Sequence, residues 1–425
     1  MKNKEYFRNK KIAVVGIARS GLACANLLYR LGARVSVSDS SDNQYTRLAV
    51  SRLESPQIKW ELGAHSEDFI RGSDMLVVSP GIKKDALPFS WAAKFAVPIV
   101  SEIEVAWMLC PAEIIAITGS NGKTTVTSMI GEILQAQRKK AFVCGNIGNP
   151  FCAQVENMDE GDYAVLEVSS FQLETIKDFR PKIALILNFS PNHLDRYNNL
   201  DEYLAAKRRI FENQGKGDFL VLNRQDPRLT GLSACNGSQL VYFSAGRGLN
   251  ENQAAVISVA SLLGIEEGVC MDIFRNFQGV EHRLEFVAEI NNVRFINDSK
   301  ATTVESTLWA LDNLQRPVVL IAGGRDKGLD YSPIIKKARD KMRRVVLIGE
   351  AKEKIKGALS PQIAVSEAGG IEDAVEIAFR QAQPGDCVLL SPMCASFDMF
   401  RDYEERGRAF KQAVFRIKPA SAEAS

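Results

Sequence analysis

The sequence has few histidines and no excess of either charge. Three of its 425 residues are histidine, and 53 lysines and arginines nearly balance 51 aspartates and glutamates, which leaves a formal net charge of +2. Proteins that bind nucleic acid usually concentrate basic residues on one surface, so this balance argues against that class. The hydrophobic fraction of 46% and the charged fraction of 24% are ordinary for a soluble globular protein.

The sequence also lacks a membrane segment, a leader peptide and a paired-cysteine motif. No apolar run approaches the ~20 residues that a membrane helix needs. The start, MKNKEYFRNKKIAVVG, is charged and leads into a strand-like run instead of a signal-peptide core. The eight cysteines are scattered and form no CxxC pair, as expected of reduced thiols in the cytoplasm. We therefore predict a cytoplasmic protein without membrane insertion, and we expect a monomer.

Short β-branched runs alternate with helix-like segments along almost the whole chain. The strand-like runs occupy residues 11–17, 34–39, 75–81, 113–119, 140–146, 163–169, 183–190, 219–223, 317–324, 344–350 and 386–392. A hairpin is expected to turn at Asn291-Asn292. Because the runs are apolar along most of their length, they predict parallel sheets with helices on both faces. We predict an α/β protein with three domains in series, at residues 1–102, 103–281 and 282–425.

A glycine-rich stretch, TGSNGKTT, follows the apolar run EIIAI. Backbone amides in such a turn, followed by a helix N-terminus, bind phosphate. Gly119 and Gly122 allow the turn to close tightly, and Lys123 can reach the terminal phosphates of a nucleotide. Thr124 and Thr125 supply a hydroxyl for magnesium. The stretch therefore predicts an ATP site.

Polar residues follow or end several other predicted strands, where ligands collect in open α/β sheets. Asn146 ends one strand and His193 follows another, in the segment NHLDRY. Glu167 lies in an apolar run, where a carboxylate is costly unless it is paired or binds a metal. Magnesium would be such a partner, and a structural ion pair is the alternative. Lys207 lies on a helix, and its spacing alone favours a solvent-exposed side chain.

The N-terminal segment GIARSG follows a strand and begins a helix, and Asp39 ends the next strand. This pattern is similar to a dinucleotide-binding fingerprint, but Ala18 replaces the middle glycine that allows close approach to a diphosphate. The replacement weakens a nicotinamide hypothesis and favours a different nucleotide in a related crevice.

Seven motifs together resemble the Mur ligases of peptidoglycan precursor synthesis: TGSNGKTT, GNIGNP, EVSSFQLE, NHLDRY with a later AAK, EHRLEFV, NDSKATT and LLSPMCASFDMFRDYEERGRAF. The resemblance covers nearly the whole chain and is strongest to members that add D-glutamate to UDP-N-acetylmuramoyl-L-alanine. It implies a Rossmann-like UDP-binding domain, a central P-loop ATPase domain and a Rossmann-like C-terminal domain. It also implies that ATP phosphorylates the substrate carboxylate before the amine of D-glutamate attacks.

The resemblance implies a role for particular residues. Nucleotide contacts fall on Gly119, Ser120, Asn121, Gly122, Lys123, Thr124, Thr125, Asn252, Arg283 and Asp298. UDP-substrate contacts fall on Ile17, Ser40, Ser41, Ser79, Gly81 and Asn146, and D-glutamate contacts on Thr302, Lys327, Ser396 and Tyr403. The catalytic set is Lys123, Glu167, His193 and Lys207, and two magnesium ions are served by Thr124, Glu167, His193 and Lys207 as its CO2-derived carbamate.

Three other hypotheses stay open on the sequence. A sister amide ligase would act on another muramoyl peptide or on folate with glutamate. A nicotinamide-dependent oxidoreductase would use GIARSG and Asp39, but it leaves TGSNGKTT unexplained. A non-catalytic ATP-binding protein could keep the same fold, although Lys123, Glu167 and His193 are all present.

Overall fold

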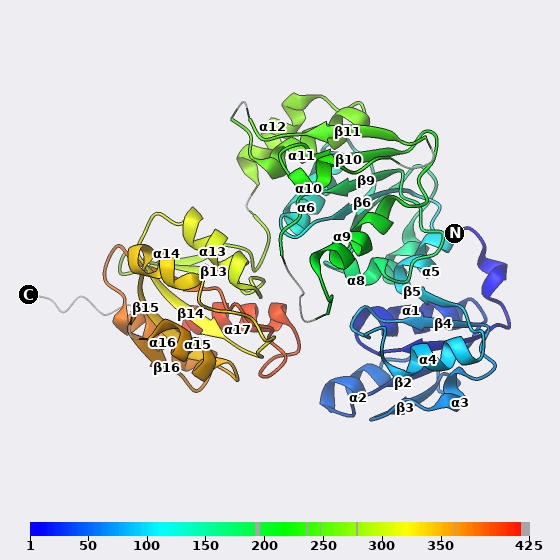
Figure 1. Ribbon diagram of the computed structural model, residues 1–425, viewed down its shortest axis with the longest axis horizontal. Coiled ribbons are helices and arrows are strands. Elements are labelled where there is room, and N and C mark those ends of the chain that lie inside the picture. Colours follow the sequence, from blue (N-terminus) through cyan, green and yellow to red (C-terminus); the bar gives the residue numbers. More distant parts are fainter. Residues whose placement is uncertain (192–195, 235–236, 247, 278, 361, 418–425) are drawn as a thin grey trace, which may run out of the picture. The chain divides into compact units, whose positions relative to one another are not determined.

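The computed structural model describes residues 1–191, 196–234, 237–246, 248–277, 279–360 and 362–417 (Figure 1). The chain divides into two parts, Met1–Phe277 and Gln278–Ser425. The first part contains two sheets and the second part contains one.

The first sheet is parallel throughout, with strand order β3-β2-β1-β4-β5. Its elements are η1 (Lys4–Phe7), β1 (Lys11–Val15), α1 (Arg19–Arg30), β2 (Arg34–Asp39), α2 (Gln44–Val50), β3 (Lys59–Leu62), α3 (Glu67–Ile70), β4 (Met75–Val78), α4 (Leu87–Lys94), β5 (Ile99–Ser101) and α5 (Glu102–Leu109). Parallel neighbours need crossover connections, and the helices between the strands supply them.

The second sheet is also parallel, with strand order β11-β10-β9-β6-β8-β7. Its elements are β6 (Glu113–Thr118), α6 (Lys123–Ala136), β7 (Ala141–Gly145), α7 (Phe151–Gln154), η2 (Val155–Asn157), β8 (Tyr163–Glu167), α8 (Ser170–Leu173), β9 (Ile183–Ile186), α9 (Leu200–Arg208), η3 (Arg209–Phe211), β10 (Phe219–Asn223), α10 (Pro227–Thr230), β11 (Gln239–Phe243), α11 (Glu251–Leu262) and α12 (Glu267–Asn276). The loop between β6 and α6 therefore starts from the middle of the sheet.

The third sheet has strand order β12-β13-β17-β14-β15-β16, and β12 alone runs antiparallel to its neighbour. Its elements are β12 (Glu285–Ile290), β13 (Val293–Asn297), α13 (Val304–Asn313), β14 (Val318–Gly323), α14 (Ile334–Lys341), β15 (Met342–Ile348), α15 (Lys352–Leu359), β16 (Val365–Glu367), α16 (Ile371–Gln381), β17 (Cys387–Leu390) and α17 (Tyr403–Arg416). The expected hairpin is confirmed, because Asn291 and Asn292 join β12 to β13 with φ values of 50° and 61°.

The strands of the second sheet bury both faces. Ile114 and Ala116 of β6 belong to one core cluster, while Ile115 and Ile117 belong to another. This alternation confirms a sheet covered on both sides. The cluster of Ile114 also contains Cys24 of α1, so the first two sheets share a hydrophobic core.

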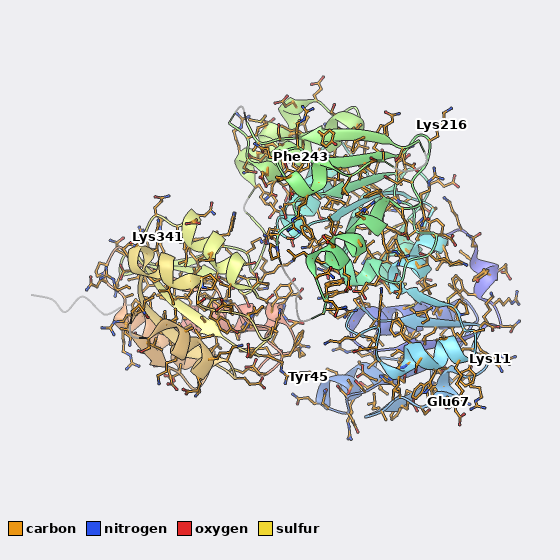
Figure 2. All side chains as sticks on the ribbon, in the orientation of Figure 1. Lys11, Tyr45, Glu67, Lys216, Phe243 and Lys341 are labelled. Atoms are coloured by element: carbon orange, nitrogen blue, oxygen red, sulfur yellow. The ribbon has the colours of Figure 1, made fainter. Side chains whose placement is uncertain are left out.

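Side chains follow the same division between core and surface (Figure 2). Phe243, at the end of β11, is buried, whereas Lys216, in the turn before β10, is exposed. In the parts of the chain that the structure describes, no helix combines the length and the apolar character that crossing a bilayer requires.

Gly21 allows α1 to approach the turn that follows β1. A Cβ atom at Gly21 would lie 1.8 Å from the Gly16 carbonyl oxygen and 3.0 Å from Ser79 Oγ. The first contact is to backbone, which cannot rotate away. The glycine that ends GIARSG is therefore required by close packing of the helix against the loop.

We predict that Gly21→Ala destabilises the protein, although alanine usually stabilises a helix interior by about 1 kcal/mol relative to glycine. The steric clash should outweigh that gain and cost about 2 kcal/mol net, as in other overpacked sites. Urea denaturation would measure the change. Gly268→Ala in α12 is the control, since a Cβ there meets nothing within 4 Å. Equal stability effects of the two substitutions would contradict this account.

Candidate active site

The predicted phosphate loop connects β6 to α6 through two glycines in the left-handed region. Gly119 has a φ of 156° and Gly122 a φ of 81°, which residues with a side chain rarely adopt. A Cβ at Gly122 would also lie 2.3 Å from Asn252 Oδ1. Asn252, which the sequence assigned to the nucleotide, therefore lies against this loop.

Residues after β9 hold the loop in place. The Asn121 amide donates to Asn188 Oδ1 at 2.8 Å, and Asn188 Nδ2 donates back to the Asn121 carbonyl at 3.2 Å. Ser120 Oγ donates to the Ser190 carbonyl at 3.0 Å and accepts from the Ser190 amide at 2.9 Å. Sequence reasoning did not assign Asn188 or Ser190 a role, although both lie in the polar stretch NFS that follows the strand.

Two lysines converge on one carbonyl of the loop. Lys123 Nζ donates to the carbonyls of Gly119 and Ser120 at 2.9 and 3.0 Å, and Lys207 Nζ donates to the Gly119 carbonyl at 2.9 Å. Lys207 is only 1% exposed, so the expectation of a solvent-exposed side chain, based on spacing alone, is wrong. Tertiary packing of α9 buries it, and its Nζ lies 4.6 Å from the centre of the Tyr203 ring.

The environment of Lys207 favours its neutral amine. Burial is the largest effect and lowers the pKa of Lys207 well below its usual value, because the charged form loses its hydration. The positive charge of Lys123 lowers the pKa further, whereas the carboxylate of Glu167 opposes the shift. A neutral amine can act as a nucleophile, which an ammonium cannot.

Glu167 is held at the end of β8 by two uncharged side chains. Thr124 Oγ1 donates to Glu167 Oε2 at 2.7 Å, and Asn146 Nδ2 donates to Glu167 Oε1 at 2.7 Å. The carboxylate is 1% exposed. A carboxylate beside a hydroxyl is a set of hard oxygen ligands of the kind that magnesium prefers, so Thr124 and Glu167 fit this ion. His193, another predicted ligand, lies outside the described residues.

Five of the six predicted UDP-substrate residues follow β1, β2 and β4 of the first sheet, whereas Asn146 follows β7 of the second sheet. The Asp39 carboxylate accepts from the amides of Ile17 and Ser41, each at 2.9 Å, which fixes the loops after β1 and β2. Ser40 lies between Asp39 and Ser41 in the chain. Ser79, after β4, donates to the Gly16 carbonyl at 2.8 Å.

Asp298 lies in the second part of the chain, directly after β13. Its side chain accepts from the Leu284 amide at 3.2 Å and from Ser391 Oγ at 2.8 Å. Burial raises the pKa of Asp298 to about 7, although Ser391, Arg283 and the Leu284 amide oppose the increase. Leu284 directly follows Arg283 in the chain, so its hydrogen bond to Asp298 places these two predicted nucleotide contacts close together.

Three of the four predicted D-glutamate residues lie in the loops after β13, β14 and β17, and the fourth is the first residue of α17. Lys327 Nζ is 3.4 Å from both the carbonyl and the hydroxyl of Thr302. Ser396 is 2% exposed and follows Ala395, whose carbonyl accepts from the Arg325 amide at 2.9 Å. Tyr403 begins α17, and its carbonyl accepts from Ser299 Oγ at 2.7 Å.

Arg406 is another residue that sequence reasoning missed. It is 1% exposed and donates to the Ser299 carbonyl at 2.8 Å and to the carbonyls of Cys394 and Ala395 at 3.2 and 3.3 Å. Its guanidinium therefore fixes the segment that leads to Ser396. Nothing in the pattern YEERGRAF distinguishes this arginine from an exposed one.

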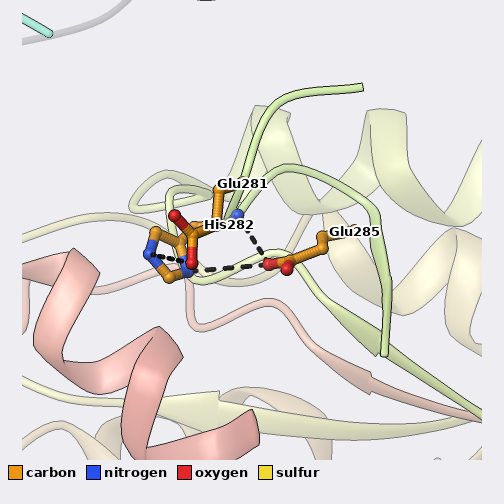
Figure 3. A group of neighbouring side chains, drawn as sticks. All are labelled: Glu281, His282 and Glu285. Carbon is orange, nitrogen blue, oxygen red and sulfur yellow. Dashed lines mark hydrogen bonds and ion pairs between the residues drawn. The ribbon is translucent and has the colours of Figure 1, made fainter. Parts of the chain in front are cut away.

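Glu281, His282 and Glu285 form the one group among the described residues whose geometry could suit a metal ion (Figure 3). Asn297 Nδ2 donates to His282 Nδ1 at 2.8 Å, so this nitrogen accepts and the ring proton lies on Nε2. Lys411 Nζ already contacts both carboxylates, at 3.0 and 2.5 Å. The cation of this cluster is an ammonium group, which disfavours a metal ion there.

Models of one family match most of the chain. Residues 10–101 match the Mur ligase MurD-like, N-terminal domain. Residues 117–280 match the Mur ligase middle domain. Residues 282–394 match the Mur ligase, glutamate ligase domain.

Curated relatives are similar along nearly their full length. The UDP-N-acetylmuramoylalanine--D-glutamate ligase of Pelotomaculum thermopropionicum is 38% identical over 449 residues, which covers 97% of this chain and 99% of that protein. The ligase of the same name from Geotalea uraniireducens is 41% identical over 441 residues, which covers 96% of this chain and 97% of that protein.

Solved structures share the fold at low sequence identity. The UDP-N-acetylmuramate-alanine ligase MurC from Thermotoga maritima has a TM-score of 0.63 at 20% identity, covering 96% of this chain and 99% of its own. The MurF ligase from Thermotoga maritima in complex with ADP has a TM-score of 0.58 at 14% identity, covering 98% and 97%.

The buried carboxyl of Asp298 predicts a pH-dependent stability. Its pKa rises from 3.8 to about 7 on folding, so the folded protein binds this proton more tightly than the unfolded chain does. The stabilisation that this proton provides is complete below about pH 4 and is lost as the pH rises through about 7. The free energy of unfolding falls by about 4 kcal/mol over this range. Asp298→Asn should remove this pH-dependent loss of stability.

Denaturant unfolding of the wild type and of Asp298→Asn between pH 4 and 8 measures the difference. Glu376→Gln, on the exposed side of α16, is the matched control and should keep the wild-type slope. Parallel stability profiles for the wild type and Asp298→Asn would contradict the prediction.

Proposed function

This chain belongs to the Mur ligase family, and on that premise we propose that it joins D-glutamate to UDP-N-acetylmuramoylalanine with consumption of ATP. It is an ATP-dependent ligase of peptidoglycan precursor synthesis. The observation that carries this conclusion is 38–41% identity across 96–97% of the chain to ligases that bear this name.

The chemistry explains why ATP is consumed. A carboxylate repels nucleophiles, and oxide is a poor leaving group. Transfer of the γ-phosphoryl group to one carboxylate oxygen gives an acyl phosphate and ADP. The amine nitrogen of D-glutamate then attacks the carbonyl carbon to form a tetrahedral intermediate. The amine loses a proton, and phosphate leaves with the former carboxylate oxygen to give the amide.

Lys123 is the residue that we assign to the β- and γ-phosphates, in a loop whose other nucleotide contacts are Gly119–Gly122, Thr124 and Thr125. Its ammonium now donates to two loop carbonyls. Phosphate oxygens would be better partners, because they carry formal charge. Neutralisation of the transferring group is the main catalytic contribution of such a site.

We assign one magnesium ion to Thr124 and Glu167, and a second to His193 together with the carbamate of Lys207. The hydrogen bond between Thr124 and Glu167 supports the first assignment, since it places a hydroxyl oxygen and a carboxylate oxygen 2.7 Å apart. When bound, magnesium neutralises negative charge on the phosphates. Asn146, which also contacts Glu167, would meet the muramoyl group of the substrate.

The carbamate assignment rests on the chemistry of a buried lysine. The pKa of Lys207 is well below its usual value because of burial, which makes the neutral amine available. Its nitrogen adds to the carbon of CO2 and releases one proton, which gives an anion. An anion beside Lys123 replaces repulsion by attraction, and it can bind a cation.

The remaining assignments follow the three-domain organisation, with boundaries at 1–102, 103–281 and 282–425. The UDP group would contact Ile17, Ser40, Ser41, Ser79 and Gly81. The nucleotide would also meet Asn252, Arg283 and Asp298, and D-glutamate would meet Thr302, Lys327, Ser396 and Tyr403. The two carboxylates of D-glutamate suit a lysine with hydroxyl donors. ATP and UDP-linked precursors are cytoplasmic metabolites, so we place the enzyme in the cytoplasm. We also propose that it is a monomer.

Family membership removes one of the three alternative functions that the sequence left open. A nicotinamide-dependent oxidoreductase has no place in this family. A sister ligase would differ in the amino acid that it adds, and the two curated relatives described above bear a D-glutamate name. A non-catalytic binding protein is distinguishable by turnover.

The function is tested by phosphate release from ATP with magnesium and UDP-N-acetylmuramoyl-L-alanine, with and without D-glutamate. We expect release only when D-glutamate is present, with L-glutamate as the matched control. Lys123→Ala should reduce turnover by roughly a hundredfold or more, the cost of losing one group that stabilises charge in the transition state. Release that ignores D-glutamate, or an unimpaired Lys123→Ala variant, would refute the corresponding assignment.

Lys207→Ala should be nearly inactive, because it removes the amine that forms the carbamate. A short free carboxylate such as acetate should restore part of the activity by standing in for the missing anion. Lys182→Ala, which changes a lysine outside the site, is the control for non-specific effects of acetate. Full activity of Lys207→Ala without any addition would show that the lysine does not hold a metal.

A further inference from the structure

Arg196 connects two segments that are far apart in the sequence. Its Nη1 donates to the Pro80 carbonyl at 2.9 Å, and its Nη2 donates to the Ile82 carbonyl at 2.9 Å. The two carbonyls belong to the turn 79–82 after β4, which carries the proposed UDP contacts. Arg196 itself lies in NHLDRY, between β9 and α9 of the second sheet.

Glu174 fixes the guanidinium from the other side. Arg196 Nε and Nη2 donate to Glu174 Oε1 and Oε2 at 3.2 and 3.0 Å, a bidentate pair. Tyr197 Oη donates to Glu174 Oε1 at 2.7 Å. The side chains of Arg196 and Glu174 are 10% and 5% exposed, so solvent screens the pair weakly. The guanidinium also lies 4.2 Å from the centre of the Phe171 ring.

The two carbonyl contacts orient the turn. Peptide units are planar and trans, so the amide of Gly81 points away from the guanidinium that the Pro80 carbonyl faces. A Cβ at Gly81 would meet nothing within 4 Å, which places open space beside this residue. The Ile82 amide donates to the Ser79 carbonyl at 3.0 Å and closes the turn.

We propose that Arg196, held by Glu174, is a positioning residue that presents the turn 79–82 to the uridine diphosphate group of the substrate. The inference rests on the proposed function, because that function places the UDP group at this turn. Arginine suits the task better than lysine, since its planar fork can bind two carbonyls and a carboxylate at once.

The same pair also couples the two sheets of the first part. The carboxylate comes from the segment after α8, the guanidinium from the segment before α9, and the carbonyls from the first sheet. The turn that binds the UDP group is therefore oriented by the sheet that carries the phosphate loop. Binding of UDP should depend on Arg196, whereas binding of ATP should not.

The test is Arg196→Lys, measured by calorimetric titration of UDP and by KM values for the UDP substrate and for ATP. We expect UDP affinity to fall about tenfold, in line with loss of a charge-assisted contact, and the KM of the UDP substrate to rise similarly. The KM of ATP should stay within about twofold of the wild-type value, because the phosphate loop is untouched.

Arg209→Lys is the matched control. Arg209 is also a partly buried arginine whose Nη1 and Nη2 donate to backbone carbonyls, those of Glu174 and Ile176, and it pairs with Glu212. It contacts the backbone carbonyl of Glu174, but its hydrogen bonds reach neither the Glu174 carboxylate nor the turn 79–82. It should therefore share any general loss of stability with Arg196→Lys, as measured by thermal unfolding, but keep the wild-type affinity for UDP.

Glu174→Gln is a second variant that tests the same inference if Arg196→Lys does not fold. It keeps the size of the side chain and removes the charge that holds the guanidinium, so UDP affinity should fall in the same direction. Unchanged UDP affinity in the folded variants, or an equal loss in Arg209→Lys, would overturn the inference.

The two proposals fail in different ways. A wild-type protein that binds UDP but releases no phosphate with D-glutamate refutes the proposed reaction and leaves the role of Arg196 standing. A wild-type protein that catalyses the reaction while Arg196→Lys keeps its UDP affinity refutes the inference alone. A wild-type protein without affinity for UDP refutes both.

Discussion

The hydrogen bond from Lys207 to the Gly119 carbonyl is the interaction around which the central site is organised. A fully buried amine is costly to charge, and Lys123 donates to the same carbonyl. Two ammonium groups on that carbonyl would repel each other, and Glu167 compensates only in part, so the site favours the neutral amine of Lys207. The site is therefore prepared for added negative charge, which phosphate oxygens and a carbamate would both supply.

The sequence predicted the interior strands and two of the six edge strands, β7 and β12, and missed the other four. β3, β5, β11 and β16 were not recognised, and each is the outermost strand of its sheet. An edge strand packs against one neighbour and buries fewer side chains, so the long apolar run that identifies a parallel strand is absent. β3, KWEL, has two exposed residues and β16 has three residues in all. Edge strands depend on a pairing partner that local sequence does not encode.

The same limit separates the site residues that chemistry could identify from those it could not. Glu167 was conspicuous because a carboxylate in an apolar run needs a partner, and the structure supplies Thr124 and Asn146. Lys207 and Arg196 did not stand out in the sequence, because a lysine or arginine on a helix or loop is usually exposed. Their burial depends on contacts with residues 88 and 116 positions away, respectively, which no periodicity reveals.

Carboxylates at strand ends accept hydrogen bonds either from backbone amides or from side chains. This difference separates carboxylates with a structural role from those that can bind a ligand. Asp39 accepts hydrogen bonds from two backbone amides, which cannot move away unless the loops unfold. Its carboxylate therefore has a structural role and is not available to a ligand. Glu167 accepts from the side chains of Thr124 and Asn146, which can rotate and take a new partner. A cation can therefore replace the donors of Glu167 at little cost, whereas a ligand at Asp39 would have to break the backbone that positions it.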